Sequence, residues 1–305
     1  YIHAFRGQTF VVAFPGELVK DDKLTVLAHD ISLLHALGIK VVLIHGLRPQ
    51  VEEQLNLRKV SNRYYKGIRI TDSEALECAK EAAGELRLDI EAAFSQGLPN
   101  TPMAHAEVRI ISGNFVTATP LGIIEGIDLQ WTGKVRRIAS ESIQMILDTG
   151  GIVLLSPLGY SPTGEAFNVL MEEVAVFAAN ALHAQKLIFL TETPAVMDVD
   201  HHQVHDITPH QVEALLSKGN LEENAAYYLK YAARACLSGI PRTHLVPYKT
   251  DGAILLELFT HDGVGTMVTP QDVEFLREAT IKDVGAILKL IEPYEKNGTL
   301  ASPAT

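Results

Sequence analysis

Continuous runs of apolar residues alternate along the chain with segments in which apolar residues recur every three or four positions. The runs at 10–14 and 41–44 are typical of strands that are buried on both faces. Between them, Leu27 and Leu34 share one face of a predicted helix, and Gly38 follows at its expected end. A strand–helix–strand unit of this kind predicts a parallel sheet, because parallel strands need such a crossover.

The same alternation continues along the chain. Further helices are predicted at 71–94, 172–182 and 222–236, and further strands at 152–155, 187–190, 244–246 and 253–256. We therefore expect an α/β protein, a three-layer αβα sandwich around a mainly parallel sheet. The pattern changes near 269–272, so we expect one domain over 1–276 and the truncated start of a second domain over 277–305.

The charge balance excludes some classes of partner. Lys and Arg number 26 against 37 Asp and Glu, a formal net charge of -11. An acidic chain is not attracted to nucleic acid or anionic lipid, and no apolar run approaches the roughly 20 residues of a membrane helix. The two cysteines, Cys78 and Cys236, lie far apart, so we expect no disulfide framework and a cytoplasmic protein. Because the chain starts abruptly at Tyr1 and stops within the second pattern, we expect it to be part of a longer protein.

Two turns follow the first two predicted strands, where α/β sheets bind ligands. In the first turn, Pro15 lacks an N–H to donate and Glu17 would repel a phosphate. In the second turn, Arg48 either binds an anion or pairs with Glu52 one helical turn later. The sequence alone leaves both alternatives open for Arg48.

Two other candidate sites receive little support. The histidines at 201, 202, 205 and 210 have the most metal-like spacing, but residues 198–202 have the composition of a turn, so we expect no metal site. Ser156 and Ser161 have no matched histidine and acid that the sequence reveals, so serine hydrolysis is not expected.

Several segments, taken in order, resemble the amino-acid kinase family. They are 1–2, 10–16, 45–46 with 49–50, 69–72, 112–115, 186–191, and 256–260 with 263–266. The resemblance covers nearly the whole chain and implies the amino-acid kinase fold, with one half for an acyl amino acid and the other for a nucleotide. Residues 277–291 resemble the opening strand and helix of a GCN5-related acetyltransferase domain.

The resemblance also implies a function for the complete protein: acetyl transfer from acetyl-CoA to the α-amino group of L-glutamate, the first step of L-arginine biosynthesis. The acetyltransferase site would lie beyond this chain. We therefore expect no catalytic residue and no cofactor in this portion, and acetyl-CoA as a substrate of the complete enzyme. A homo-oligomer is implied as well.

The chain departs from the kinases in the turns that hold phosphate. Kinases of the family carry a lysine, paired glycines, a second glycine run and an Asn-Ala-Asp motif. The residues in these places are Ala13, Pro15 and Gly16, then Leu47 and Arg48, then Leu170, Met171 and Glu172. Only Lys230 matches a kinase lysine. Because phosphoryl transfer depends on positioned positive charge, we expect an inactive kinase domain; the alternative is an active N-acetylglutamate kinase that uses ATP.

Arginine-sensitive members of the family bind free L-arginine as a feedback effector. The positions that the resemblance implies are Tyr1, Lys186, His244, Glu257, Gly263 and Gly265. A carboxylate at 257 suits a guanidinium, a lysine at 186 suits the ligand's carboxylate, and the glycines permit close backbone approach. Three alternatives are structural: a strand-end Glu257 paired with a lysine, a Lys186 that merely flanks a strand, and a core His244. A structural assembly module without any ligand is a further alternative.

Overall fold

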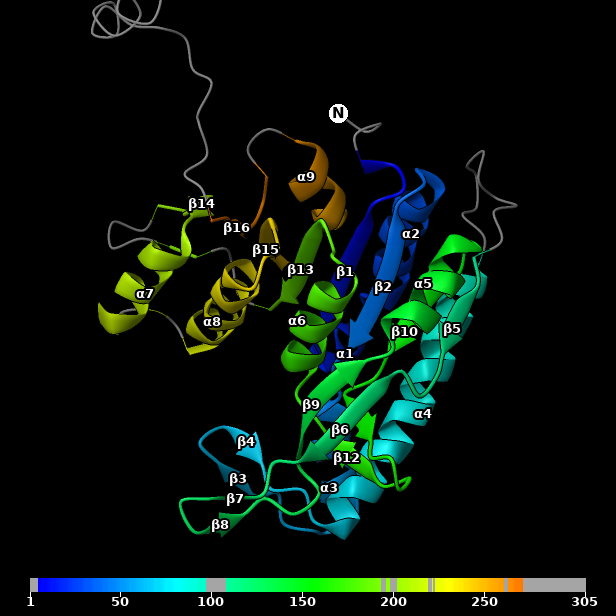
Figure 1. Ribbon diagram of the computed structural model, residues 1–305, viewed down its shortest axis with the longest axis vertical. Helices are drawn as coiled ribbons and strands as arrows, with labels where there is room; N and C mark the ends of the chain where they lie inside the picture. Colours follow the sequence, from blue (N-terminus) through cyan, green and yellow to red (C-terminus); the bar gives the residue numbers. More distant parts are fainter. Residues whose placement is uncertain are drawn as a thin grey trace, which may run out of the picture. The chain divides into compact units, whose positions relative to one another are not determined.

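The structure is a computed structural model that describes residues 5–96, 108–192, 196–197, 202–218, 221, 223–260 and 263–270. The elements of these residues belong to the unit Tyr1–Asp272. An eight-stranded sheet lies at their centre, in the order β14-β16-β15-β13-β1-β2-β10-β5 (Figure 1). In that order the strands are Asp206–Ile207, Thr266–Val268, Arg242–Pro247, Lys186–Thr191, Thr9–Phe14, Lys40–His45, Ile152–Leu155 and Ile110–Ser112. The second domain predicted over 277–305 lies outside the described residues.

The sheet is parallel over most of its width. Strand β1 pairs in parallel with β2 and β13, β10 pairs in parallel with β2 and β5, and β13 pairs in parallel with β15. The direction reverses at one edge, where β16 is antiparallel to β15 and parallel to β14. The predicted mainly parallel sheet is therefore confirmed.

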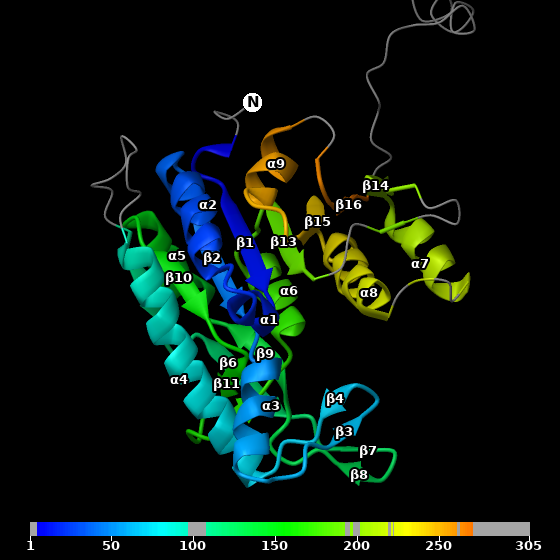
Figure 2. The same ribbon diagram turned by 180° about the vertical axis from the view of Figure 1, so that it is seen from behind.

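Helices cover both faces of this sheet (Figures 1 and 2). They are α1 Gly16–Lys20, α2 Leu24–Ala36, α3 Arg48–Leu57, α4 Ser73–Ser95, α5 Ser140–Asp148, α6 Met171–Ala181, α7 Pro209–Lys218, α8 Glu223–Leu237 and α9 Ala253–Phe259. Alternate residues of β1 explain the two apolar layers: Val11 and Ala13 pack with residues of α5 and α6, whereas Phe10, Val12 and Phe14 pack with residues of α2, α4 and α9. The predicted three-layer αβα sandwich is confirmed.

A smaller sheet extends the fold beyond the carboxyl ends of β1 and β2 (Figure 1). Its order is β12-β11-β6-β9, with strands Ala166–Asn168, Leu158–Tyr160, Val116–Pro120 and Gly133–Ile138. Two hairpins lie in the same region: β3 Tyr64–Tyr65 with β4 Ile68–Arg69, and β7 Ile123–Ile124 with β8 Ile127–Asp128. None of the helices in the described residues is long and apolar enough to span a membrane.

Local sequence explains the ends of several elements. The Asp72 side chain accepts a hydrogen bond from the Ala75 N–H at 2.9 Å and caps α4, which confirms the helix predicted there. Gly38 follows α2 with φ +85°, in the left-handed region that suits glycine at a helix end. The strand predicted at 253–256 is wrong, because these residues form the start of α9. A short, uniformly apolar run does not distinguish a buried helix from a buried strand.

Candidate functional site

Lys186 is the first residue of β13 and is almost completely buried, at 2% exposure. In the sheet register Lys186 pairs with Phe10 of β1 and Arg242 of β15. Its Nζ lies 5.3 Å from the ring centroid of Phe5 and donates a hydrogen bond to Nε2 of His244 at 3.0 Å. Charged residues are buried only rarely and then with partners, so the interpretation of Lys186 as a solvated strand-flanking residue is wrong.

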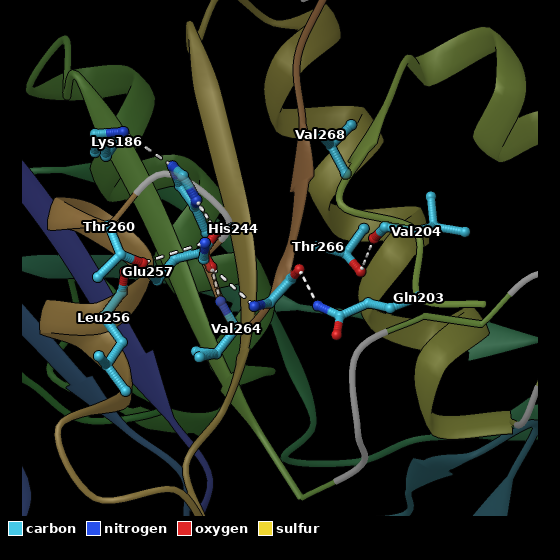
Figure 3. A network of polar contacts seen from close by, with 12 residues as sticks. Lys186, Gln203, Val204, His244, Leu256, Glu257, Thr260, Val264, Thr266 and Val268 are labelled. Carbon is cyan, nitrogen blue, oxygen red and sulfur yellow. Dashed lines mark hydrogen bonds and ion pairs between the residues drawn. The ribbon is translucent and has the colours of Figure 1, made fainter.

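His244 connects this lysine to Glu257, which lies in α9 (Figure 3). The Nδ1 N–H of His244 donates to Oε1 of Glu257 at 2.7 Å, and the two side chains are only 4% and 6% exposed. Oε2 of Glu257 accepts backbone N–H groups from Val264 at 2.9 Å and Gly265 at 2.8 Å. The interpretation of Glu257 as a strand-end residue paired with a lysine is therefore wrong: it is a helix residue whose side-chain partner is a histidine.

The two glycines of the adjoining turn are required by close packing. Gly263 has φ +60°, and a Cβ there would lie 2.5 Å from Oε2 of Glu257. A Cβ at Gly265 would lie 2.2 Å from the backbone oxygen of Leu245. The absence of side chains lets the turn's backbone approach the Glu257 carboxylate. The predicted approach of this backbone to a ligand stays a prediction.

Burial sets the charges of this network. Burial, together with the nearby Lys186 and Arg242 cations, lowers the pKa of His244 to about 4, although its hydrogen bond to Glu257 opposes this shift. Burial and the Arg242 charge lower the pKa of Lys186 to about 8. Burial acts to raise the pKa of Glu257, but the bonds from His244 and the backbone N–H groups hold it below its usual value. At neutral pH a charged lysine therefore donates to a neutral histidine, which donates to a carboxylate.

The structure adds residues to this site that the sequence analysis missed. Gln203 donates from Nε2 to the Gly265 oxygen at 2.9 Å, and the Thr266 hydroxyl donates to the Val204 oxygen at 2.6 Å (Figure 3). These bonds attach the glycine turn to the segment before β14. Thr266 belongs to the segment that carried the family resemblance, although no role was predicted for it, whereas Gln203 belongs to no motif and the sequence carried no signal for it. Tyr1, also predicted for this site, lies outside the described residues.

A cavity of about 150 Å³ lies at the other end of the sheet, beyond the carboxyl ends of β1 and β2. It is lined by parts of the two turns that follow β1 and β2, by residues of the hairpin β3–β4 and by the start of α6. Its charged lining residues are Glu17, Arg48, Arg69, Glu172 and Glu192. Lys230 is exposed on α8 and is not among the described residues that line the cavity.

The structure separates the two alternatives for Arg48. Its Nη2 donates to the Gly67 oxygen at 3.1 Å, and its guanidinium lies over the ring of Tyr64 at 5.5 Å. Glu52 instead accepts from the Tyr64 hydroxyl at 2.6 Å and lies 3.6 Å from Arg69. Pairing of Arg48 with Glu52 is therefore wrong, and the anion-binding alternative stays open.

Ser156 has a histidine partner that the sequence analysis did not expect. His45 Nε2 lies 2.8 Å from the Ser156 hydroxyl, because β2 and β10 are adjacent in the sheet. The other ring nitrogen lies 3.1 Å from the Gly46 backbone oxygen, so a carbonyl and not an acid orients the ring. Burial lowers the pKa of His45 to about 4. The pair satisfies a buried ring and lacks the acid of a hydrolase triad.

The histidine cluster offers no metal site within the part of the chain that the structure covers. No group of three or more His, Cys, Asp or Glu side chains in the described ranges could hold a metal ion. His201 lies outside those ranges.

Comparisons with known proteins place the chain in a family. The model of the amino acid kinase family matches residues 8–241. The amino-acid acetyltransferase of Ralstonia nicotianae is 58% identical over 98% of this chain and 66% of its own length. The amino-acid acetyltransferase of Azotobacter vinelandii is 48% identical over 98% of this chain and 69% of its own length. The chain thus spans about two thirds of the length of the curated relatives it matches.

Solved structures agree with these matches. An N-acetylglutamate synthase from Neisseria gonorrhoeae, complexed with coenzyme A and L-arginine, has a TM-score of 0.83 and 31% identity over 100% of this chain and 70% of that one. A carbamate kinase from Giardia lamblia bound to AMP-PNP shares the fold, with a TM-score of 0.63 and 16% identity over 87% of this chain and 99% of that one. This chain belongs to the amino acid kinase family and, within it, to the amino-acid acetyltransferases.

Proposed function

We propose that this chain is the L-arginine-binding regulatory portion of an N-acetylglutamate synthase, whose complete form acetylates the α-amino group of L-glutamate with acetyl-CoA. The observation that supports this proposal most directly is a buried series of hydrogen bonds that joins Lys186, His244 and Glu257. The backbone N–H groups of Val264 and Gly265 complete it by donating to Glu257. The resemblance to a synthase that was solved with L-arginine supports the same assignment.

The donors and acceptors of this network are complementary to arginine. Oε1 of Glu257 accepts one hydrogen bond, from His244, and a carboxylate oxygen can accept two. A guanidinium can therefore add to this oxygen without displacing the histidine. An ammonium has three donors, and one of those on Lys186 goes to His244, which leaves donors for the ligand's carboxylate. The positions of Gly263 and Gly265 keep side chains out of the turn beside the ligand.

The proposal includes three further expectations. Residues 277–305 would begin the acetyltransferase domain, and the protein would assemble as a homo-oligomer. The kinase-like domain would not transfer phosphate, since the cavity beside its turns is lined by three glutamates and only two arginines, and phosphoryl transfer depends on positioned positive charge. Arginine can regulate acetyl transfer only if it binds one arrangement of the two domains more tightly than another, because equal affinity shifts nothing.

Calorimetric titration of the chain with L-arginine tests the proposal. L-Citrulline, which has the same shape without the charge, should bind at least tenfold more weakly, because a charge-assisted hydrogen bond contributes roughly 1.5 to 3 kcal/mol. Glu257→Gln should reduce arginine affinity at least tenfold, whereas the control Glu213→Gln, at an exposed position of α7, should not.

Lys186→Met examines the other end of the ligand. It should weaken arginine binding while affecting agmatine, which lacks the carboxylate, much less. Normal arginine binding by both the Glu257 and the Lys186 variants would place the effector elsewhere. In the complete enzyme both variants should retain acetyl transfer and lose the response to arginine; loss of basal activity as well would show that the residues support the fold instead.

A further inference from the structure

The three side chains proposed to hold arginine are almost completely buried. Lys186 is 2% exposed, and the side chains of His244 and Glu257 are 4% and 6% exposed. We propose that α9, which carries Glu257, is a gate that opens to admit the effector, and that the buried carboxylate of Asp30 on α2 lowers the free energy of opening. The identity of the effector rests on the proposed function, whereas the opening of α9 does not.

Helix α9 is the smallest element of this site. It has seven residues, whereas Lys186 and His244 lie in β13 and β15, which pair with each other over six residues. Gly252 precedes the helix with φ +70° and Gly263 follows it with φ +60°. Hinges commonly lie at small residues near the ends of an element. Rotation at these two glycines would move Glu257 away from His244 (Figure 3) and leave the sheet intact.

Asp30 places a buried carboxylate against the first turn of α9. It belongs to α2 and is 7% exposed. Its side chain interacts with the backbone N–H of Ile254, and the first N–H groups of a helix have no partner within that helix. Gly252, at the N-cap of α9, has no side chain that could take this role. The carboxylate therefore lies in the contact between α2 and α9.

The charge of Asp30 lacks a cation that would compensate its burial. Lys23, which lines the same small cavity, pairs with Asp251 at 2.9 Å, and Asp30 forms no ion pair within 4 Å among the described residues. Tyr248 lines this cavity from beyond the end of β15, and its hydroxyl donates to Asp21 at 2.8 Å. The side chains of α4 in the surrounding core are apolar. Because burial of an unpaired carboxylate is unfavourable, its exposure favours the open form of α9.

The protonation of Asp30 gives the direction of this effect with pH. Burial raises the pKa of Asp30 to about 6, although the Ile254 N–H opposes the shift and the Asp251 charge adds to it. In an open form the carboxylate would meet water and return to a pKa near 3.8. The proton therefore stabilises the closed form. This stabilisation is fully present below pH 3.8 and is lost as the pH rises through about 6, so at neutral pH Asp30 favours opening.

Hydrogen exchange of the unliganded chain, followed by mass spectrometry of peptides that cover 253–259, tests the gate without arginine. Asp30→Asn keeps the shape of the side chain and removes its charge, so at pH 7 it should slow exchange there at least tenfold, since one pKa unit is a factor of ten. Peptides of α5, on the opposite face of the sheet, should be unaffected. Unchanged exchange at 253–259, or equal slowing in α5, would overturn the role of Asp30.

Two further variants accompany this measurement. Asp89→Asn, at an exposed position of α4, is the matched control and should exchange like the original chain. Asp30→Ser also lacks the charge and keeps an oxygen for the Ile254 N–H, so it should slow exchange in the same region. Circular dichroism verifies that each variant is folded. Slowing by Asp89→Asn as well would contradict a specific role for Asp30.

The pH dependence of the same exchange is measured as a ratio between two proteins. The excess of α9 opening in the original chain over Asp30→Asn should shrink about tenfold from pH 7 to pH 5, because Asp30 becomes protonated in the closed form. The ratio removes the contribution of His244, whose pKa is about 4 when buried and whose proton favours the open form. A ratio that is the same at both pH values would contradict the proposal.

L-Arginine connects the gate with the proposed function. A ligand that bonds to both Glu257 and Lys186 holds α9 closed, so saturating L-arginine should slow exchange at 253–259 in the original chain at least tenfold. Arginine that binds in calorimetry but leaves this exchange unchanged would overturn the gate. Absence of any heat of arginine binding, together with slow exchange in Asp30→Asn, would refute the proposed function and support the opening of α9.

Discussion

At the scale of single residues, His244 makes stability depend on pH. Its pKa is about 4 in the folded protein and about 6.5 in an unfolded chain, so between these values the unfolded state binds the proton. The contribution of the neutral His244 to the free energy of unfolding is therefore fully present above pH 6.5, and it is lost as the pH falls toward 4. From pH 7 to pH 5 we expect a loss of roughly 2 kcal/mol from this residue.

Urea denaturation at the two pH values measures this effect. In His244→Gln the decrease in unfolding free energy between pH 7 and pH 5 should be smaller by that amount. The control His210→Gln, at an exposed position in the first turn of α7, should keep the decrease of the original chain. An identical decrease in all three proteins would mean that His244 does not titrate in this way.

Single residues also show how far the sequence predicts the site. The resemblance brought Lys186, His244 and Glu257 together as ligand-binding candidates, but it did not indicate that they contact one another in series. Contacts such as His45 with Ser156 depend on which strands become neighbours. Strand order arises from the packing of the whole sheet, so residues 111 positions apart gave no local signal for this pair.

At the scale of elements, the glycine turn between α9 and β16 depends on close backbone packing. A Cβ at Gly265 would meet the backbone oxygen of Leu245 at 2.2 Å, and β15 cannot move without disturbing its pairing with β13. Gly265→Ala should therefore lower the unfolding free energy by about 1 to 3 kcal/mol, as overpacking does. It should also weaken arginine binding, because the turn holds Glu257.

Gly84→Ala is the matched control for this prediction. Gly84 lies inside α4, and a Cβ there meets nothing within 4 Å. Alanine is favoured over glycine in a helix by roughly 0.5 to 1 kcal/mol, so this variant should be more stable than the original chain. Thermal or urea unfolding of the two variants measures their stability. Equal stability of both variants would contradict the packing argument.

Elements also differ in how well the sequence predicts them. Strands β1, β2, β10 and β13 were predictable because a continuous apolar run between polar turns is typical of a strand that is buried on both faces of a parallel sheet. Helix α9 was not, since its sequence is almost uniformly apolar and seven residues long, which suits a strand equally well. Its helical form follows from the tertiary packing of Ala253, Ile254 and Leu258 against the β1 face.

At the scale of the whole molecule, the two candidate sites lie at opposite ends of one sheet. The Lys186 network lies near the amino end of β13, and the cavity lies at the carboxyl ends of β1 and β2. The carboxyl edge is where α/β folds bind their ligands. This chain therefore has a cavity at the edge where α/β folds bind ligands, and its charged lining combines three glutamates with two arginines.

Loss of the kinase reaction is the prediction that follows at this scale. Phosphoryl transfer needs positioned cations around the transferred group, yet Ala13 and Pro15 occupy the first turn and Glu17 and Glu172 line the cavity. With N-acetyl-L-glutamate, ATP and magnesium, a coupled ADP-release assay should therefore detect no turnover by this chain. An authentic N-acetylglutamate kinase serves as the positive control. Turnover of about 1 per second, ordinary for an enzyme, would show that the remaining charges suffice and that the kinase activity survives.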